Sequence, residues 1–331
     1  MGSSAASAVC LRAIMREPDL EVVGVVTQPD RPAGRGKALT PCPCKAFAVV
    51  HGIRTVIAPE NVNAPEAMAK IREWAPDVIA VVAFGQFLGK ALLTLPPHGC
   101  VNCHFSLLPK YRGASPVTAA IAAGEKITGV SVMRMDEGMD TGPIMLQSYE
   151  PIYSDETGGA LMSDLATTGG VTLAKALRLL CHGQLPPEMP QKNEDASYAK
   201  KLRKTDGLID WAEPVIVTER RIRAYSPWPG CFTFLPQRFR KKGNSGRVIV
   251  AKSEIVSDMK PAWREAKPGT VLECISSRPK GTTGPTGPIV KCGDTAIMLT
   301  ELKPEGGSVM QGGDFLRGRP LVPGDDAFLT A

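Results

Sequence analysis

Valine-rich runs that suit buried strands alternate with helix-like segments in the first part of the chain. The runs Leu20–Val26 and Asp77–Ala83 are largely apolar on both of the faces that a strand would present. Apolar residues at helical spacing occur in Ala5–Arg16 and Ala64–Trp74. Strands without a polar face are buried on both sides, and the intervening helices supply the cover. The pattern therefore predicts an α/β domain with a mostly parallel sheet, which binds its ligands beyond the carboxyl ends of the strands.

Length and composition narrow the possibilities. A chain of 331 residues favours two domains, and 43% hydrophobic with 22% charged residues is typical of globular proteins, which excludes wholesale disorder. We find no run approaching about 18 apolar residues and no secretory signal, so no membrane association is expected. The 9 cysteines, an odd number scattered along the chain, indicate reduced thiols.

The composition changes near His182. Residues 182–197 contain three prolines and few apolar anchors, which is typical of a linker. Beyond them, the helix-like stretch Val217–Tyr225 precedes short apolar runs separated by Gly, Pro and basic residues, a spacing typical of a small antiparallel barrel or sandwich. These runs are Cys231–Leu235, Val248–Val250, Thr270–Leu272, Pro288–Val290 and Ala296–Leu299. We therefore assign the first domain to residues 1–181, the linker to 182–197 and the second domain to 198–331.

The net charge of +6 is unevenly distributed. Residues 1–190 carry a net charge of −1, whereas residues 191–331 carry +7. A basic second part indicates that it binds a polyanion, although a solvated basic surface fits the charge equally well.

One short motif points toward metal chemistry and fails on context. Cys100-Val101-Asn102-Cys103-His104 fits the haem-attachment pattern, but it lies in an apolar strand of a chain without an export signal. A second pair of cysteines or histidines at zinc-ligand spacing is missing from the sequence. We therefore predict neither haem nor a metal site.

The segment 101–116 combines polar residues with the end of a predicted strand. Asn102 and His104 are two residues apart and therefore share a face, immediately before a loop rich in Pro and Gly. A carboxamide beside an imidazole can hold an oxyanion and handle a proton, as acyl transfer requires. Asp140, in a glycine-flexed loop, could reach His104. The spacing alone favours the interpretation that Asn102 and His104 satisfy backbone groups and that Asp140 caps a turn.

Three segments resemble the catalytic part of the methionyl-tRNA formyltransferases. The signature Asn102-x-His104-x-Ser106-Leu107-Leu108-Pro109-x-x-Arg112-Gly113 resembles the active-site segment of that family. Asp136-x-Gly138-x-Asp140-x-Gly142 resembles its second segment, and Val82-Ala83-Phe84-Gly85-Gln86 is similar to the strand-to-loop segment beside the folate site.

Two further segments distinguish this branch from formyltransferases that act on glycinamide ribonucleotide or sugars. Thr27–Lys37 is similar to the loop that contacts the acceptor end of tRNA. Ile209–Trp211, together with Arg223–Gly230, resembles the C-terminal domain. Five ordered matches cover most of the chain, so the resemblance is not coincidental.

The resemblance implies a Rossmann-like domain followed by an OB-like barrel, and a formyl group moved from 10-formyltetrahydrofolate to initiator methionyl-tRNA. Asn102 and a protonated His104 would stabilise the oxyanion, and Asp140 would favour the imidazolium and relay a proton. The folate-binding residues implied are Phe84, Gly85, Gln86, Ser106, Leu107, Leu108, Pro109 and Asp136. The tRNA-binding residues are Arg35, Lys37 and Arg112, together with the basic cluster Arg238, Arg240, Lys241, Lys242 and Arg247. A monomer is expected.

The N-terminus departs from the family pattern. Family members begin with a strand that ends in a Gly-Thr/Ser-Pro turn, whereas this chain begins at about that turn, with Gly2-Ser3-Ser4. We therefore expect a truncated N-terminus, unpaired edges on the neighbouring strands and no readable targeting peptide. The cytoplasm is expected for a bacterial source, and a mitochondrion or plastid for a eukaryotic one.

Two alternatives stay open. A formyltransferase acting on a small amine, such as an amino sugar nucleotide, would retain Asn102, His104 and Asp140 without needing the Arg35 loop or the basic second domain. An inactive RNA-binding relative would retain the basic second domain. A formyl-transfer assay separates these alternatives from the tRNA enzyme.

Overall fold

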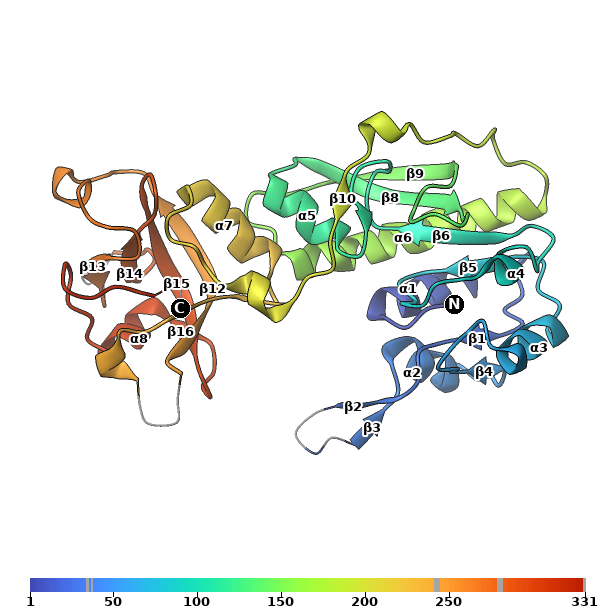
Figure 1. Ribbon diagram of the computed structural model, residues 1–331, viewed down its shortest axis with the longest axis horizontal. Helices are drawn as coiled ribbons and strands as arrows, with labels where there is room; N and C mark the ends of the chain where they lie inside the picture. Colours follow the sequence, from blue (N-terminus) through green and yellow to red (C-terminus); the bar gives the residue numbers. More distant parts are fainter. Residues whose placement is uncertain (34–35, 37, 241–244, 279–281, 330–331) are drawn as a thin grey trace. The chain divides into compact units, whose positions relative to one another are not determined.

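The computed structural model describes residues 1–33, 36, 38–240, 245–278 and 282–329, which fall into two units (Figure 1). The first unit comprises Met1–Val117, Lys126–Ile152 and Ala160–Lys200. The second comprises Thr118–Glu125, Tyr153–Gly159 and Lys201–Ala331.

The first unit is an α/β structure. Its elements are α1 (Ala5–Ile14), β1 (Val25–Val26), β2 (Arg31–Ala33), β3 (Ala38–Thr40), α2 (Pro43–Val50), β4 (Val56–Ile57), α3 (Pro65–Glu73), β5 (Ile79–Val81), α4 (Lys90–Leu93), β6 (Cys100–His104), β7 (Arg112–Gly113), β8 (Ile127–Arg134), β9 (Ile144–Pro151) and β10 (Tyr198–Ala199). Two helices, α5 (Pro116–Ala123) and α6 (Gly158–Cys181), contain residues of both units.

The central sheet of the first unit has the strand order β5-β6-β8-β9. Strands β5 and β6 pair in parallel, as do β1 and β4, whereas β8 pairs antiparallel with both β6 and β9. The prediction of parallel pairing is confirmed for β1–β4 and β5–β6 and is wrong for β8, which runs antiparallel to β6. Strand β9 was not predicted; the short loop before it can only reverse the chain, because a parallel crossover needs a dozen or more residues.

Helix α6 runs along the sheet that carries the site (Figure 1). The Sγ of Cys103 on β6 donates to the Gly169 carbonyl oxygen of α6 over 3.7 Å. A Cβ at Gly169 would lie 3.0 Å from that sulfur, and one at Gly170 would lie 3.0 Å from Ala13 Cβ of α1. The two glycines therefore allow α6 to approach both β6 and α1, which fixes the strand that carries Asn102 and His104.

The chain start lies between β1 and β5. The Gly2 N–H donates to Val26 O at 3.0 Å, and the Val82 N–H donates to Met1 O at 2.9 Å. Beyond this contact lies an apolar cavity of about 150 Å³, which we call the N-terminal slot; its lining includes Met1, Leu11, Val25, Ile71, Trp74 and Ile79. The N-terminal ammonium donates to Ala80 O, and burial lowers its pKa below the usual 8.0. The pairing of β1 with β4 covers only Val25–Val26 of the predicted strand Leu20–Val26.

The second unit is built around an antiparallel sheet. Its elements are α7 (Val215–Ala224), β11 (Cys231–Phe234), β12 (Arg247–Val256), β13 (Val271–Ile275), β14 (Gly287–Lys291), β15 (Ala296–Pro304), β16 (Met310–Gln311) and α8 (Gly312–Gly318). The strand order is β11-β12-β15-β14-β13, with β16 paired to β15. Trp211, Val250, Leu299 and Phe315 belong to its core. Each of the five predicted apolar runs overlaps one strand from β11 to β15.

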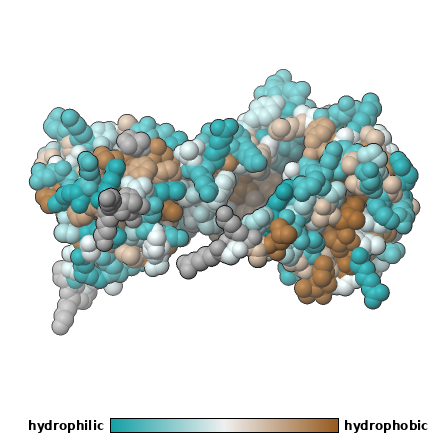
Figure 2. All heavy atoms as spheres, turned by 60° about the horizontal axis from the view of Figure 1, so that its bottom comes forward, coloured by the Kyte–Doolittle hydropathy of each residue, from teal (hydrophilic) through white to brown (hydrophobic). Residues whose placement is uncertain are grey.

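Polar surface covers much of the first unit, interrupted by apolar patches on the right of Figure 2. Its exposed large hydrophobic side chains include Leu39 of the β2–β3 hairpin, Val50 at the end of α2, and Phe87. The hairpin begins in the Thr27–Lys37 segment that the sequence associates with tRNA. Across the described residues, the helices are all too short or too polar to span a membrane.

Candidate active site

Strand β6 places Asn102 and His104 on one face of the sheet. It is flanked by β5 and β8, with Val81 opposite Asn102 and Ser131 opposite His104. Side chains two residues apart on a strand point the same way, so both polar groups emerge together near the carboxyl end of β6.

The loop between β8 and β9 brings Asp140 to the same place. Asp136 Oδ1 accepts from the Gly138 N–H at 3.0 Å and from the Thr141 hydroxyl at 2.7 Å, which tightens the loop. Asp140 adopts a left-handed backbone conformation with φ of 54°. A Cβ at Gly142 would lie 1.9 Å from the Arg134 carbonyl oxygen, so only glycine fits there. The loop is thus fixed by local contacts rather than freely swinging.

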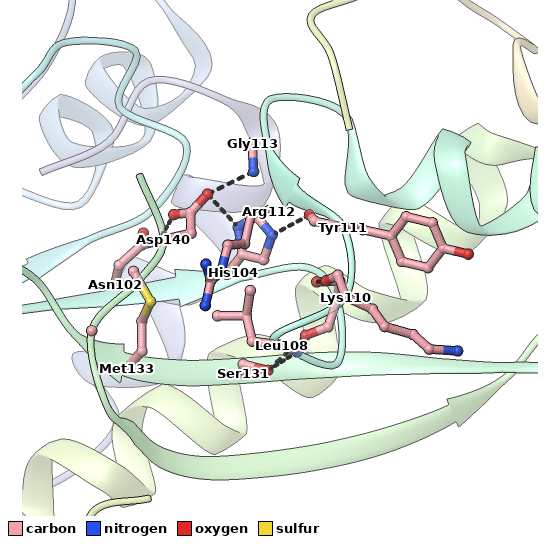
Figure 3. Close-up of polar contacts among 12 residues, drawn as sticks. Asn102, His104, Leu108, Lys110, Tyr111, Arg112, Gly113, Ser131, Met133 and Asp140 are labelled. Carbon is pink, nitrogen blue, oxygen red and sulfur yellow. Dashed lines mark hydrogen bonds and ion pairs between the residues drawn. The ribbon is translucent and has the colours of Figure 1, made fainter. Parts of the chain in front are cut away.

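The three predicted catalytic side chains converge in the structure (Figure 3). The Asn102 Nδ2 group donates to Asp140 Oδ1 at 3.4 Å, and His104 Nδ1 lies 3.6 Å from Asp140 Oδ2. Asp140 Oδ2 also accepts from the Gly113 N–H at 2.8 Å, while His104 Nε2 lies 2.9 Å from the Tyr111 carbonyl oxygen. The side chains of His104 and Asp140 are 7% and 15% exposed, so the group is partly shielded from water.

This arrangement suits acyl transfer chemistry. His104 Nε2 faces the Tyr111 carbonyl oxygen, which can only accept a proton, and Nδ1 faces the Asp140 carboxylate at a longer distance. Asn102 supplies a neutral donor beside it, and Asp140 supplies a carboxylate that can accept a proton. Donors aimed at a developing negative oxygen, together with a nearby base, are what formyl transfer to an amine needs.

The three residues of the predicted folate segment after β5 occupy different environments. Phe84 is buried in the core that includes Val81 and Leu88. Gly85 has a φ of 82°, which places it at a turn. The Gln86 carboxamide accepts from the Val62 N–H at 2.7 Å and donates to the Pro59 carbonyl at 2.9 Å. Phe84 and Gln86 therefore shape this loop through its own packing and hydrogen bonds.

The predicted folate residues after β6 form a tight, mostly buried turn. The Ser106 hydroxyl donates to Lys110 O at 2.7 Å, and the Leu108 N–H donates to the Ser131 hydroxyl at 2.9 Å. Leu108 is buried, Leu107 is half-buried, and the Leu108–Pro109 peptide bond is cis. The turn holds the end of β6 in place.

Asp136 lies on the wall of a cavity of about 720 Å³ next to the Asp140 loop. The cavity is also lined by Lys90, Leu93, Pro96, Arg134, Met135, Glu137 and Gly138. Its walls mix aliphatic surface with charged groups, and Lys90 Nζ lies 3.3 Å from Glu137 Oε1. The volume is within the range of about 300–1,000 Å³ typical of small-molecule sites.

The described residues predicted to bind tRNA have contacts within their own units. Arg112 is 1% exposed, and its guanidinium donates to Gln191 Oε1 and Asn193 Oδ1, so it points inward. Arg238 pairs with Asp326, Arg240 donates to Leu235 O, and Arg247 lies 3.8 Å over the Phe232 ring. The predicted residues Arg35, Lys37, Lys241 and Lys242 lie outside the described residues.

Sequence reasoning missed three contributors to the site. Tyr111 and Gly113 act through backbone atoms, which a side-chain pattern cannot reveal. Gln191 donates to the Asp140 and Gly142 carbonyls, although it lies in the stretch interpreted as a linker. In the sequence, Gln191 is only a polar residue that follows a proline among other polar residues. This pattern has neither helical nor strand periodicity and gives no signal of a role in the site.

Metal binding receives no support from side-chain clustering. In the parts of the chain that the structure describes, no group of three or more His, Cys, Asp or Glu residues could hold a metal ion.

The chain matches two family descriptions over most of its length. Residues 2–177 match the formyl transferase family, and residues 201–320 match the formyl transferase C-terminal domain. The chain therefore belongs to the formyl transferase family, as its motifs indicate.

Curated relatives identify the branch. The methionyl-tRNA formyltransferase of Myxococcus xanthus is 41% identical over 94% of this chain and 91% of its own length. Proteins of the same name from Symbiobacterium thermophilum and Xanthomonas campestris are each 41% identical, over 96% and 92% of this chain and over 91% and 92% of their own lengths. The resemblance to this branch is confirmed.

Solved structures share the fold at low sequence identity. A Helicobacter canadensis N-formyltransferase, solved with folinic acid and dTDP-3-aminofucose, has a TM-score of 0.57 and 15% identity over 90% of this chain and 96% of its own. HypX from Aquifex aeolicus, solved with tetrahydrofolic acid, has a TM-score of 0.55 and 16% identity over 92% of this chain and 50% of its own. These likenesses establish the formyltransferase fold, with a Rossmann-like first domain and a second domain built on a sheet.

Proposed function

We propose that this protein transfers a formyl group from 10-formyltetrahydrofolate to the amino group of initiator methionyl-tRNA. The observation that carries the proposal is 41% identity to methionyl-tRNA formyltransferases over nearly the whole chain. The convergence of Asn102, His104 and Asp140 supplies a chemical basis for the same reaction.

In the proposed mechanism the amine attacks the formyl carbon, and negative charge develops on the formyl oxygen. The Asn102 carboxamide and the protonated His104 donate to that oxygen, His104 through Nδ1, because its Nε2 is bonded to the Tyr111 carbonyl. Each contributes about 2.7–4 kcal/mol if they behave like other oxyanion donors. Asp140 keeps His104 protonated through charge and accepts the proton released by the amine, which then passes through water to the folate nitrogen that leaves. The Gly113 N–H orients the carboxylate.

We propose that the folate co-substrate occupies the cavity beside Asp136. Aliphatic walls from Leu93, Pro96 and Met135 suit a flat ring system, and charged groups at the same wall suit its polar edges. We also propose folate contacts for Phe84, Gly85, Gln86 and Ser106–Pro109, whose hydrogen bonds hold the loops on either side of the site.

We assign folate binding and catalysis to residues 1–181 and tRNA binding to an OB-like barrel in residues 198–331. Barrel closure is supported by the last described segment, which bonds to the two edges of the sheet. Phe234 of β11 exchanges backbone hydrogen bonds with Leu329, and the Phe328 N–H donates to Gly269 O just before β13.

Transfer RNA binding rests on the basic second domain and on the Thr27–Lys37 segment. Arg35, Lys37, Arg238, Arg240, Lys241, Lys242 and Arg247 are the residues proposed to contact it. Contacts with phosphates release counterions, so affinity should fall steeply as salt rises. An affinity for initiator tRNA that is independent of salt would contradict this assignment.

We further propose that the enzyme acts as a monomer without membrane association. The relatives reported above are bacterial proteins, and the cytoplasm is the corresponding site of action for a bacterial source. Size-exclusion chromatography with light scattering tests the monomer.

A formyl-transfer assay tests the central proposal. Purified protein is incubated with radiolabelled 10-formyltetrahydrofolate and, in separate reactions, with initiator methionyl-tRNA or an amino sugar nucleotide. We expect label only in the tRNA product. Label in the sugar, or tRNA binding without transfer, would overturn the proposal in favour of a small-amine enzyme or an inactive RNA-binding protein.

A further inference from the structure

The Asp140 backbone is held from a segment some fifty residues later in the chain. The Gln191 Nε2 group donates to the carbonyl oxygens of Asp140, at 2.9 Å, and Gly142, at 2.7 Å. One side-chain amide thereby ties together the two backbone groups that flank the turn of the Asp140 loop. The left-handed conformation of Asp140 leaves these carbonyls without the partners of a regular strand or helix.

The orientation of Gln191 is itself fixed by Arg112. Arg112 Nε and Nη2 donate to Gln191 Oε1 at 3.1 and 2.9 Å, and Nη1 donates to Asn193 Oδ1 at 3.0 Å. An amide whose oxygen accepts from a buried guanidinium must direct its NH₂ group to the other side. Arg112 follows Tyr111 and precedes Gly113, whose backbone atoms contact His104 and Asp140. These hydrogen bonds thus connect the segment that contacts His104 and Asp140 with the backbone of the Asp140 loop.

We propose that Gln191 is a positioning residue for formyl transfer, which holds the Asp140 turn in the geometry that aims its carboxylate at Asn102 and His104. Arg112 is assigned to the same network instead of to tRNA contact, because its guanidinium is buried and bonded within the first unit. The inference rests on the proposed function, because it assumes that Asp140 takes part in formyl transfer.

Two substitutions at Gln191 test the inference. Gln191→Glu keeps an acceptor for Arg112 but replaces the donor to the two carbonyls with a negative oxygen. Gln191→Asn keeps the amide but shortens its reach by one methylene. The matched control is Gln184→Glu, the same substitution at an exposed glutamine of the same segment, outside the Arg112 network. All three proteins are compared with the wild type as full-length chains.

We expect both Gln191 variants to lower kcat by about tenfold to a hundredfold, because small displacements of a catalytic group have effects of this size. The KM values for folate and tRNA should stay within twofold, and Gln184→Glu should keep the kcat of the wild type. Wild-type kcat in either folded Gln191 variant would overturn the inference.

Hydrogen exchange provides a readout that does not depend on activity. The Gly113 N–H is bonded to Asp140 Oδ2, whereas the neighbouring Arg112 and Ala114 N–H groups are bonded to Ser197 and Ala199. We expect faster exchange at Gly113 in the Gln191 variants and unchanged exchange at its two neighbours. Unchanged exchange at Gly113 would overturn the positioning role. An inactive wild-type protein would instead overturn the proposed function, and the exchange result would then decide the positioning role by itself.

Discussion

Two neighbouring regions of the first unit, the catalytic group at the end of β6 and the N-terminal slot beside β5, are built in opposite ways. At the catalytic group, the Asp140 carboxylate is surrounded by donors from Asn102, His104 and Gly113. At the slot, apolar side chains surround a cavity and a buried ammonium. Hydrogen bonds hold the catalytic group in place, whereas the N-terminal slot is a space that its apolar side chains do not fill.

The comparison teaches that activity and stability are decided at different places in the same sheet. The catalytic loops are tied together by their own hydrogen bonds, although β6 pairs directly with β5. We therefore expect substitutions at the catalytic group to change kcat with little effect on thermal unfolding, and changes at the slot to do the reverse.

The largest effect is expected at the proposed oxyanion donors. His104→Ala and Asn102→Ala should each lower kcat by about 10²–10³-fold, because each removes one donor to the developing oxyanion. Their Tm values should stay close to that of the wild type. The control is His98→Ala, another histidine just before β6. Near-normal kcat in either site variant would contradict the assignment.

The next effect tests the charge of Asp140. Asp140→Asn keeps an oxygen that can accept from the Gly113 N–H but removes the negative charge and the base. We expect kcat to fall by about 10²-fold, as for loss of a general acid or base, with unchanged Tm. Steady-state kinetics and a thermal melt on the same preparation measure kcat and Tm. A fall in Tm together with the fall in kcat would contradict the expected difference between the two regions.

A substitution in the slot wall should act in the opposite sense. A Cβ at Gly24 would lie 2.3 Å from Trp74 Cε3, so Gly24→Ala forces the indole to move. We expect a loss of about 1–3 kcal/mol in the free energy of unfolding, as for other overpacked sites. The kcat of the folded protein should not change. Gly318→Ala, where a Cβ meets open space, is the matched control for urea unfolding.

The smallest effect concerns the buried N-terminal amine. Because burial lowers its pKa below 8.0, the unfolded chain binds a proton that the folded chain lacks in the interval between the two values. The contribution of this group to stability should therefore rise with pH across that interval and level off above pH 8.0. N-terminal acetylation should abolish this part of the pH dependence. Identical Tm profiles for the free and acetylated proteins would show that the ammonium carries no penalty.

Much of the fold follows from local patterns. Strand β6, helix α7 and strands β11 to β15 were predictable, because their apolar residues recur with the period of their element. Helix α6 was not predicted, since Gly169 and Gly170 in its middle suggest a break. Only the folded structure shows why they are there, because both are close-packed against β6 and α1.

The residues of the site likewise divide into those that the sequence reveals and those that only the folded structure reveals. Asn102 and His104 were found because their spacing places them on one face of a strand, and Asp140 because it lies in a glycine-rich loop. Gln191 could not be found, because its role depends on a return of the chain to the first unit that composition does not encode. Arg112 was misleading for a related reason, since a basic residue in a Pro/Gly loop suggests exposure whereas this one is buried.

The left-handed backbone at Asp140 has a consequence for laboratory evolution. At a φ of 54°, asparagine is tolerated as well as aspartate, and its side-chain oxygen can still accept from the Gly113 N–H, so this replacement leaves the chain as foldable as before. A selection that scores expression or heat resistance would thus retain proteins that have lost their chemistry. Variant libraries of this protein need a screen for product formation at every round.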